Sequence, residues 1–467
     1  MRARLLILIA LSLPAVLIGL EGCRDQRDPR APESPEGVGE PVETIAVPAF
    51  AMGTPDVVLL VTGGSNGRLE ICSCCGIAPG GLTRRSGLAA SYRAAFPRTL
   101  LLDTGDAFWV DPKDFRNDFV VQGYRLVGYD VQMLADHEWA VAPDRLRHLF
   151  TEGPVQYLST NVVPTPPPLG AKGPRGPAVV PCVLREWGAV KVAVVSDAPP
   201  DSLYIRPERR DDVQFTDPNL PARIVDRLKD EGYVVILIAH AGAEAVERIA
   251  AATRADLILR GHLTRSDGNV NTVAGKPVLK IGGADHVGAV ALKVSGGRMV
   301  ALEYRLEAVD DRWPIDERLK FLYESYAHAE ARQALDANRD TPVEYVSSAE
   351  CGKCHARQYE FWKGTSHSGA YGTLVKESKQ TDSTCLVCHV SGLGLAGGFA
   401  SNQKTPHLAG VNCQDCHRLN VAEHRRPGFR VPRVPQEACQ VCHTPLQSPH
   451  FMDFYEDDYK TKATCPK

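Results

Sequence analysis

The chain has no dominant charge and, beyond its first residues, no long hydrophobic run. Its 53 Lys and Arg nearly balance 56 Asp and Glu, for a formal net charge of -3 over 467 residues. This balance gives no electrostatic reason to expect nucleic acid or an anionic membrane surface as a partner. No later run reaches the ~18 apolar residues of a membrane helix, and residues 55–345 lack the repeats of solenoids and propellers. The length predicts at least two domains.

The N-terminus has the features of an export signal. Two arginines precede an apolar run at 5–20, and Gly22 precedes Cys23. Residues 1–22 are therefore predicted to be removed. LEGC resembles a bacterial lipobox, in which Cys23 becomes the lipidated first residue, although Glu21 departs from the usual small or apolar residue. The alternative is an ordinary cleaved signal with an incidental cysteine. Both predict a location in the periplasm or at the cell surface.

The pattern C-x-x-C-H occurs four times after residue 350, as CGKCH, CLVCH, CQDCH and CQVCH. In this pattern two thiols form thioethers with the haem vinyl groups, and the adjacent histidine binds the iron. Zinc ribbons or disulfides are the alternative, but they do not require a histidine after every cysteine pair. We therefore predict four covalently bound c-type haems. The attachment cysteines and proximal histidines are Cys351, Cys354, His355, Cys385, Cys388, His389, Cys413, Cys416, His417, Cys439, Cys442 and His443.

The second axial ligand decides what each haem does. A histidine on the far face closes the iron for electron transfer, whereas an open face can bind a small ligand. The candidate distal histidines are His367, His407, His424 and His450, with Met452 as a weaker alternative. Each of them could instead be an exposed loop histidine. The sequence does not pair a distal histidine with a particular haem.

Residues 348–467 resemble the nitrification-type tetrahaem cytochromes c. The resemblance is carried by YEFWKGTSHSGAYGTL, VSGLGLAGGF, LAGVNCQDCH and CHTPLQSPHF. It implies a compact, mostly helical and irregular domain that the haems hold together, because so few residues cannot supply a large core. It also implies an electron carrier with periplasmic or membrane redox proteins as partners. Because that family often leaves one haem open, a haem oxidoreductase acting on a small nitrogen or sulfur compound remains an alternative.

Residues 55–305 alternate short apolar runs with helical stretches, including DVVLLV, RTLLLDTGD, VKVAVVSD, YVVILIAH and DLILRGH. This alternation predicts an α/β fold with its chemistry at the strand ends. The polar residues at those ends are Asp103, Asp106, Asp136, His137, Glu138, His240 and His262.

The order of these motifs resembles the calcineurin-like metallophosphoesterases, closest to the 5'-nucleotidase branch. The resemblance implies a sandwich of two mixed sheets flanked by helices, with two metals that activate water and bind phosphate. Three ligand positions differ. Gly64 and Asn66 stand where the family has its first aspartate and histidine, and Thr264 stands for the last histidine of G-H-x-H. By the resemblance, all three belong to one of the two metals.

By the same resemblance, the ligands of the second metal survive as Asp106, Asp136, His240 and His262. His137 matches the family's acid for the leaving group, and we expect Glu138 to orient its ring. These four residues predict a site for one divalent ion. The alternative is a vestigial site that binds no metal. With one ion lost, no pair of metals would stabilise both the attacking and the leaving oxygen of the ester. The resemblance also implies that the haem region stands where true 5'-nucleotidases have their C-terminal nucleotide-binding domain. A single-metal hydrolase of phosphate or sulfate esters, with the haems as a redox module, therefore remains the rival function.

Cysteines outside the haem motifs, other than Cys23, are Cys72, Cys74, Cys75, Cys182 and Cys465. For the first four of these, disulfides are expected in an oxidising compartment. A soft-metal site and a redox-active thiol pair at C-S-C-C are the alternatives.

These features predict an exported electron-transfer protein with a degenerate metallophosphoesterase-like domain. The predicted segments are a signal peptide at 1–22, a Pro- and Glu-rich lipid-anchored tether at 23–54, the metallophosphoesterase-like domain at 55–310, a helical connector at 311–345 and the tetrahaem domain at 346–467.

Overall fold

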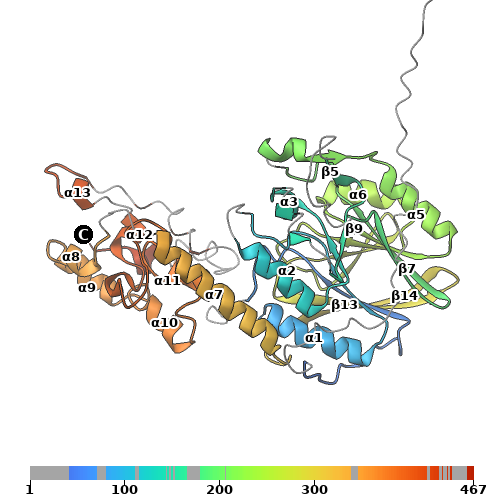
Figure 1. Cartoon of the computed structure of the whole chain (residues 1–467), viewed down its shortest axis with the longest axis horizontal. Helices are drawn as coiled ribbons and strands as arrows, with labels where there is room; N and C mark the ends of the chain where they lie inside the picture. Colours follow the sequence, from blue (N-terminus) through green and yellow to red (C-terminus); the bar gives the residue numbers. More distant parts are fainter. Residues whose placement is uncertain are drawn as a thin grey trace, which may run out of the picture.

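The computed structural model describes most of the chain after residue 41. The described ranges are 42–70, 80–110, 115–142, 145–146, 149–150, 153–165, 179–205, 207–337, 345–417, 421–430, 434, 439, 442–443 and 460–466. The predicted signal peptide, Cys23, the C-S-C-C cysteines, His450 and Met452 lie outside these ranges. Figure 1 shows two lobes joined by the long helix α7 (Glu317–Ala337).

The first sheet of the larger lobe has the strand order β14-β13-β1-β2-β3-β4. Its strands β1 to β4 are parallel, whereas β13 pairs antiparallel with both β1 and β14. The bounds are β1 Val57–Thr62, β2 Thr99–Asp103, β3 Val131–Met133, β4 Gln156–Leu158, β13 His286–Ser295 and β14 Arg298–Ala308.

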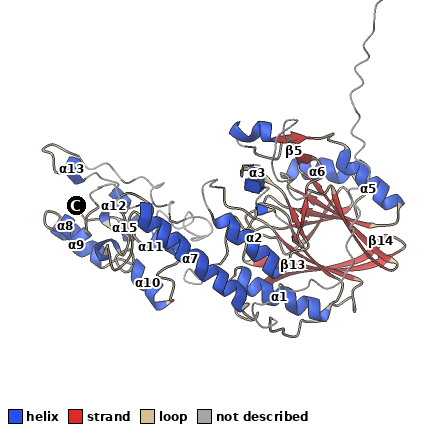
Figure 2. Ribbon diagram, in the orientation of Figure 1, coloured by secondary structure: helices blue, strands red, loops and turns tan. Residues whose placement is uncertain are grey.

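The second sheet has the strand order β11-β12-β10-β9-β7-β6 and is also mixed. The bounds are β6 Cys182–Trp187, β7 Val190–Asp197, β9 Val234–Ala239, β10 Leu257–Arg260, β11 Val270–Val273 and β12 Lys276–Lys280. A separate pair joins β5 (Val162–Pro164) to β8 (Val213–Phe215). Figure 2 shows the strands of the two sheets together within this lobe.

Helices cover the outer faces of the two sheets. The helices α1 (Leu82–Ala95) and α2 (Arg116–Val127) contribute buried side chains to the same core as the first sheet, whereas α5 (Leu220–Asp230) and α6 (Ala243–Ala252) pack in a second cluster with the second sheet. All six residues of β1 and of β9 are buried, as expected for central strands covered on both faces. The predicted α/β sandwich of two mixed sheets flanked by helices is confirmed.

The smaller lobe is helical and irregular, also as predicted. Its helices are α8 Ser348–Gly352, α9 Ala356–Lys363, α10 Ala370–Lys376, α11 Ser383–His389, η4 Pro406–Leu408, α12 Cys413–His417, α13 Val421–His424 and α15 Lys460–Ala463. Its cluster of buried apolar residues is small and consists of Leu374, Cys385, Leu386, Val390, Phe399 and Leu408.

Helix α7 makes contact with both lobes. The ring of Tyr326 packs edge-on against Phe119 of α2, with ring centroids 5.4 Å apart. Near the other lobe, the Lys379 ammonium lies 4.7 Å from the centroid of the Tyr323 ring. None of the described helices has the length and apolar character needed to cross a membrane.

Candidate functional site

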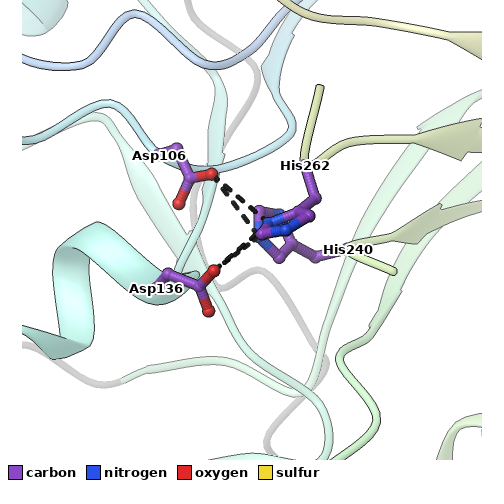
Figure 3. Close-up of side chains that lie close together, drawn as sticks. All are labelled: Asp106, Asp136, His240 and His262. Atoms are coloured by element: carbon purple, nitrogen blue, oxygen red, sulfur yellow. Dashed lines mark hydrogen bonds and ion pairs between the residues drawn. The ribbon is translucent and has the colours of Figure 1, made fainter. Parts of the chain in front are cut away.

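Two carboxylates and two imidazoles meet at the carboxyl ends of strands from both sheets. Asp106 lies in the loop after β2, Asp136 begins the short helix α3 (Asp136–Trp139), His240 follows β9, and His262 follows β10. One ligand atom from each residue lies within 4.8 Å of the others. Figure 3 shows the four side chains pointing toward one another. The fold thus brings together all four residues that the sequence assigned to the retained metal.

The distances fit a single cation. His240 Nε2 lies 3.5 Å from Asp106 Oδ2 and 3.7 Å from Asp136 Oδ2. His262 Nδ1 lies 3.2 Å from Asp136 Oδ2 and 2.9 Å from His240 Nε2. Two carboxylate oxygens and two imidazole nitrogens suit Zn²⁺, Mn²⁺ or Fe²⁺ better than Mg²⁺ or Ca²⁺, which prefer oxygen alone.

Backbone groups orient two of these side chains. His240 Nδ1 lies 3.3 Å from the carbonyl oxygen of Thr104, which leaves Nε2 directed at the carboxylates. The backbone N–H of Tyr204 donates to Asp136 Oδ1 at 2.7 Å, so that Oδ2 faces the imidazoles. Burial opposes ionisation of Asp136, but hydrogen bonds from His240 and His262 hold the pKa of its carboxyl well below the usual range.

Asp106 and His262 have left-handed backbone conformations, both with φ of 57°. A non-glycine residue in this region costs of order 1–3 kcal/mol and persists only where its surroundings enforce it. Two such residues in one cluster of four indicate that the fold maintains strain to hold these side chains in place.

Glu138 holds the Asp106 loop, and the expectation that it orients His137 is wrong. Its buried carboxylate accepts the backbone N–H groups of Asp106 (3.2 Å), Ala107 (2.8 Å) and Phe108 (3.2 Å). The imidazole of His137 instead lies with Nδ1 2.8 Å from the carbonyl oxygen of Phe108. Burial, reinforced by the charge of Asp106, raises the pKa of Glu138 to about 8.

Backbone closes the other metal position. Gly64 has φ of 63°, and a Cβ added there would lie 2.8 Å from the carbonyl oxygen of Leu263. The amide of Asn66 folds back to donate to the carbonyl oxygen of Gly64 at 3.0 Å. Thr264 is exposed. This edge therefore lacks both the ligands and the space for an aspartate at position 64.

Sequence reasoning missed a buried network beside the closed position. The fully buried Arg85 of α1 donates to the hydroxyl of Tyr129 at 2.8 Å and to Ser65 Oγ at 3.3 Å. Asp103, one of the polar residues predicted at the strand ends, belongs to this network and not to the metal cluster. It accepts a hydrogen bond from the hydroxyl of Tyr124 at 3.0 Å, and burial raises the pKa of its carboxyl. Arg85 directly follows Arg84, and nothing in this pair predicts that one of them is buried, since arginine is usually exposed.

The haem motifs of the smaller lobe lie close together. None of the eight motif cysteines is in a disulfide, so each sulfur is available for a thioether to haem. Cys413 Sγ lies 3.3 Å from Ser348 Oγ, which places the third motif against the helix that carries the first. Cys388 Sγ lies 3.9 Å from the carbonyl oxygen of Cys442, which places the second motif against the fourth.

Two proximal histidines face candidate distal histidines. His355 Nε2 and His424 Nε2 lie 3.4 Å apart, and their rings are nearly parallel, with an interplanar angle of 30°. The rings of His443 and His367 have centroids 6.1 Å apart. His407 is exposed. Two nitrogens directed at each other across a short gap fit an iron bound on both faces.

The other two proximal histidines have different surroundings. His389 Nδ1 lies 2.7 Å from the carbonyl oxygen of Ala370, which leaves its Nε2 for the iron. Among the described residues, the buried Nδ1 atoms of His417 and His424 have no hydrogen-bond partner. The motif cysteines, their adjacent histidines and the opposition of His355 and His424 form a donor set that fits haem.

Known proteins resemble the two lobes separately. The profile of the family described as cytochrome c554 and c-prime matches residues 350–418. Cytochrome c-554 of Nitrosomonas europaea is 31% identical over 139 residues, an alignment that covers 22% of this chain and 58% of that protein. The chain therefore spans less than two thirds of this curated relative.

The larger lobe has similar solved structures. The sulfate thiohydrolase SoxB of Thermus thermophilus has a TM-score of 0.52 at 19% identity, covering 62% of this chain and 63% of that one. A 5'-nucleotidase precursor, also of Thermus thermophilus, has a TM-score of 0.49 at 19% identity, with 62% and 61% covered. The chain joins a phosphoesterase fold to a cytochrome c554-like domain. At these identities the structural similarity shows the fold alone.

The cysteines outside the motifs separate into two groups. In the phosphoesterase-fold lobe, Cys182 is disulfide-bonded, and its partner lies outside the described residues. In the cytochrome c554-like domain, Cys465 is a free, exposed thiol. The disulfide expectation concerned Cys72, Cys74, Cys75 and Cys182, and it holds for Cys182, the one of these four that the structure describes.

Proposed function

We propose that the protein is an exported tetrahaem c-type cytochrome that transfers electrons in the periplasm or at the cell surface, and that its phosphoesterase-fold lobe retains one divalent metal. The observation that carries the proposal is the opposition of His355 and His424, whose Nε2 atoms lie 3.4 Å apart. An iron held by histidine on both faces has no open position for substrate and exchanges electrons without changing its ligands.

The contacts between motifs support a continuous electron route. The first motif adjoins the third through Ser348 and Cys413, and the second adjoins the fourth through Cys388 and Cys442. Ser391, two residues after the second motif, donates to the carboxylate of Asp415 in the third, which places the second motif beside the third. Each haem attached to these cysteines would therefore have another haem beside it, so that an electron could enter at one motif and leave at another.

The phosphoesterase-fold lobe supports a second, weaker function, hydrolysis of a phosphate or sulfate ester. The observation in its favour is His137, whose Nδ1–H donates to the Phe108 carbonyl oxygen and leaves Nε2 to protonate a leaving group. The metal would supply a polarised water and charge stabilisation. Because the other metal position is closed, a second ion cannot help to stabilise the attacking and leaving oxygens. Hydrolysis is therefore the secondary candidate.

The haem proposal is tested with the purified, haem-loaded full chain. We expect four haems per chain, reversible reduction by dithionite, and low-spin spectra for the haem with the His355–His424 pair. His424→Ala should add one carbon-monoxide-binding haem relative to the unchanged protein. His286→Ala, which removes a histidine beside Asp285 in the phosphoesterase-fold lobe, should add none. A chain that holds no haem, or haems that cannot be cycled between oxidation states, would contradict the proposal.

Export and a lipid anchor at Cys23 belong to the same proposal. Fractionation of cells that express the full chain should place it in a membrane fraction outside the cytoplasm. Cys23→Ala should release it into the soluble periplasmic fraction if the anchor is lipid. Membrane association that survives this substitution would contradict the anchor but not the haem function.

A further inference from the structure

The segment after His424 is the most basic part of the haem domain. Residues 424–436, HRRPGFRVPRVPQ, contain four arginines and no acidic residue, in a chain whose formal net charge is -3. Residues 425–430 are all exposed. Arg426 and Arg430 form no ion pair within the part of the chain that the structure describes. Their charges therefore face solvent.

A tight turn gives this segment a defined shape. The backbone N–H of Phe429 donates to the carbonyl oxygen of Arg426 at 3.2 Å, and Gly428 has φ of 83°. Proline at the second position and a left-handed glycine at the third are the signature of a type II turn. The arginines and Phe429 are thus displayed on a fixed turn. We name the surface of Arg425, Arg426, Phe429 and Arg430 the arginine turn.

Phe429 links this surface to a predicted axial ligand. Its ring packs edge-on against the imidazole of His424, with centroids 5.4 Å apart and an interplanar angle of 86°. The side of His424 that carries Nε2 faces His355. Phe429 is nevertheless 37% exposed. A partner that covers Phe429 would therefore lie one side chain away from the ligand of the first haem.

We propose that the arginine turn is the docking surface for an acidic electron-transfer protein, which exchanges electrons with the haem held by the first motif. The inference rests on the electron-transfer function proposed above. An exposed aromatic residue with cationic residues around it matches the apolar centre and charged rim of a small protein interface. In the step itself, the partner's cofactor loses one electron and ferric haem gains it; no bond forms or breaks.

The position of the turn favours a protein partner over a lipid surface. The described chain begins on the larger lobe, where the backbone N–H of Ile45 donates to Ser91 of α1 at 3.1 Å. Figure 1 shows α13 at the outer edge of the smaller lobe and α1 in the larger lobe. A lipid anchor at Cys23, as proposed above, would join the chain through the larger lobe, whereas the arginine turn lies on the smaller one.

The test uses haem-loaded full chain and a small acidic flavodoxin, reduced to its hydroquinone, as the probe. Stopped-flow absorbance at low and high salt gives the second-order rate constant of haem reduction. Arg426→Glu with Arg430→Glu should lower this constant at least tenfold at low salt, because charge complementarity sets the encounter rate. The difference should disappear at high salt, where exposed charges are screened.

A matched control makes the same change of charge elsewhere on the haem domain. Lys376→Glu with Lys404→Glu replaces two exposed lysines, one of them at the end of α10, which Figure 1 shows apart from α13. We expect less than a twofold effect from it. Phe429→Ala should slow electron transfer within the complex and leave the salt dependence unchanged, whereas Phe429→Tyr should restore the rate.

Three outcomes separate the failures. An unchanged rate with the arginine variant, or an equal loss with the lysine control, overturns the docking surface. Loss of binding to phosphatidylglycerol vesicles with an unchanged flavodoxin rate also overturns it and assigns the arginine turn to a lipid surface. If dithionite itself fails to reduce the haems of the unchanged protein, the underlying electron-transfer function falls instead.

Discussion

The two lobes achieve a stable structure by different means. In the phosphoesterase-fold lobe, the central strands are buried throughout, and the packed core supports strained residues at the candidate metal site. In the cytochrome c554-like domain, the cluster of buried apolar residues is small, and the cysteines and histidines converge. A packed core can survive the loss of its cofactor, whereas a domain built around haem cannot.

The largest expected effect is loss of the haem domain alone. If the chain is expressed without haem attachment, the region from residue 346 onward should be digested by a protease, because too little apolar surface is buried to order it. The larger lobe should persist as a resistant fragment with its own thermal transition, detected by mass spectrometry and calorimetry. Equal resistance of both lobes without haem would remove the contrast between them.

The second prediction concerns the retained metal. Asp106→Ala should abolish the bound divalent ion, which we expect at one equivalent in the unchanged protein by elemental analysis. The lobe should also lose roughly 3–4 kcal/mol of metal-linked stability at saturating metal, since binding to the folded state alone stabilises it. Asp201→Asn, at an exposed carboxylate paired with Arg248, should change neither quantity. Metal retained by Asp106→Ala would mean that the four residues are not its ligands.

The third prediction distinguishes the closed metal position from the retained one. Gly64→Asp returns the carboxylate that the phosphoesterase frame implies, yet it should lower stability by roughly 3 kcal/mol and add no second ion, because left-handed strain and the Leu263 carbonyl oppose it. Gly188 is the matched control, since its φ of 64° is nearly the same and a Cβ there meets nothing within 4 Å. Gly188→Asp should cost only the strain, about 1 kcal/mol. Equal losses would show that the position is open.

The smallest effect is expected where the lobes meet. Burial raises the pKa of Glu70 to about 7, and the charge of Lys379 on the haem domain opposes the rise. Folded Glu70 keeps its proton where the unfolded residue has lost it, so stability should fall by roughly 2 kcal/mol as pH rises from about 4.5 to 7. Denaturant titrations across this range should show that Glu70→Gln removes the decline and Lys379→Met steepens it. A free energy of unfolding that does not change with pH in the unchanged protein would contradict the raised pKa of Glu70.

The sequence predicted the fold class and the residues of the cluster, because strand ends in parallel sheets converge and the motifs occur in a known order. It also named the histidines that the smaller lobe brings face to face. It did not predict that His424 faces His355, since that pairing depends on how irregular segments fold back. It also assigned Glu138 the wrong neighbour, because adjacency along a short helix does not bring the two side chains together.

Burial of Arg85 and closure over Gly64 were likewise beyond sequence reasoning. Both depend on long-range packing, of α1 against the loop at Ser65 and of the Leu263 carbonyl against Gly64. Local composition records neither contact. By contrast, the prediction that positions 64, 66 and 264 lack metal ligands rests on the flanking motifs, which fix the alignment with the family pattern.

The Leu263 carbonyl over Gly64 also couples two loops that are far apart in the sequence. Because it occupies the space that a side chain at position 64 would need, a larger residue there requires the loops at Gly64 and Leu263 to move together. His262 directly precedes Leu263 and belongs to the cluster with Asp106, Asp136 and His240. A change at Gly64 would therefore also disturb the candidate metal site.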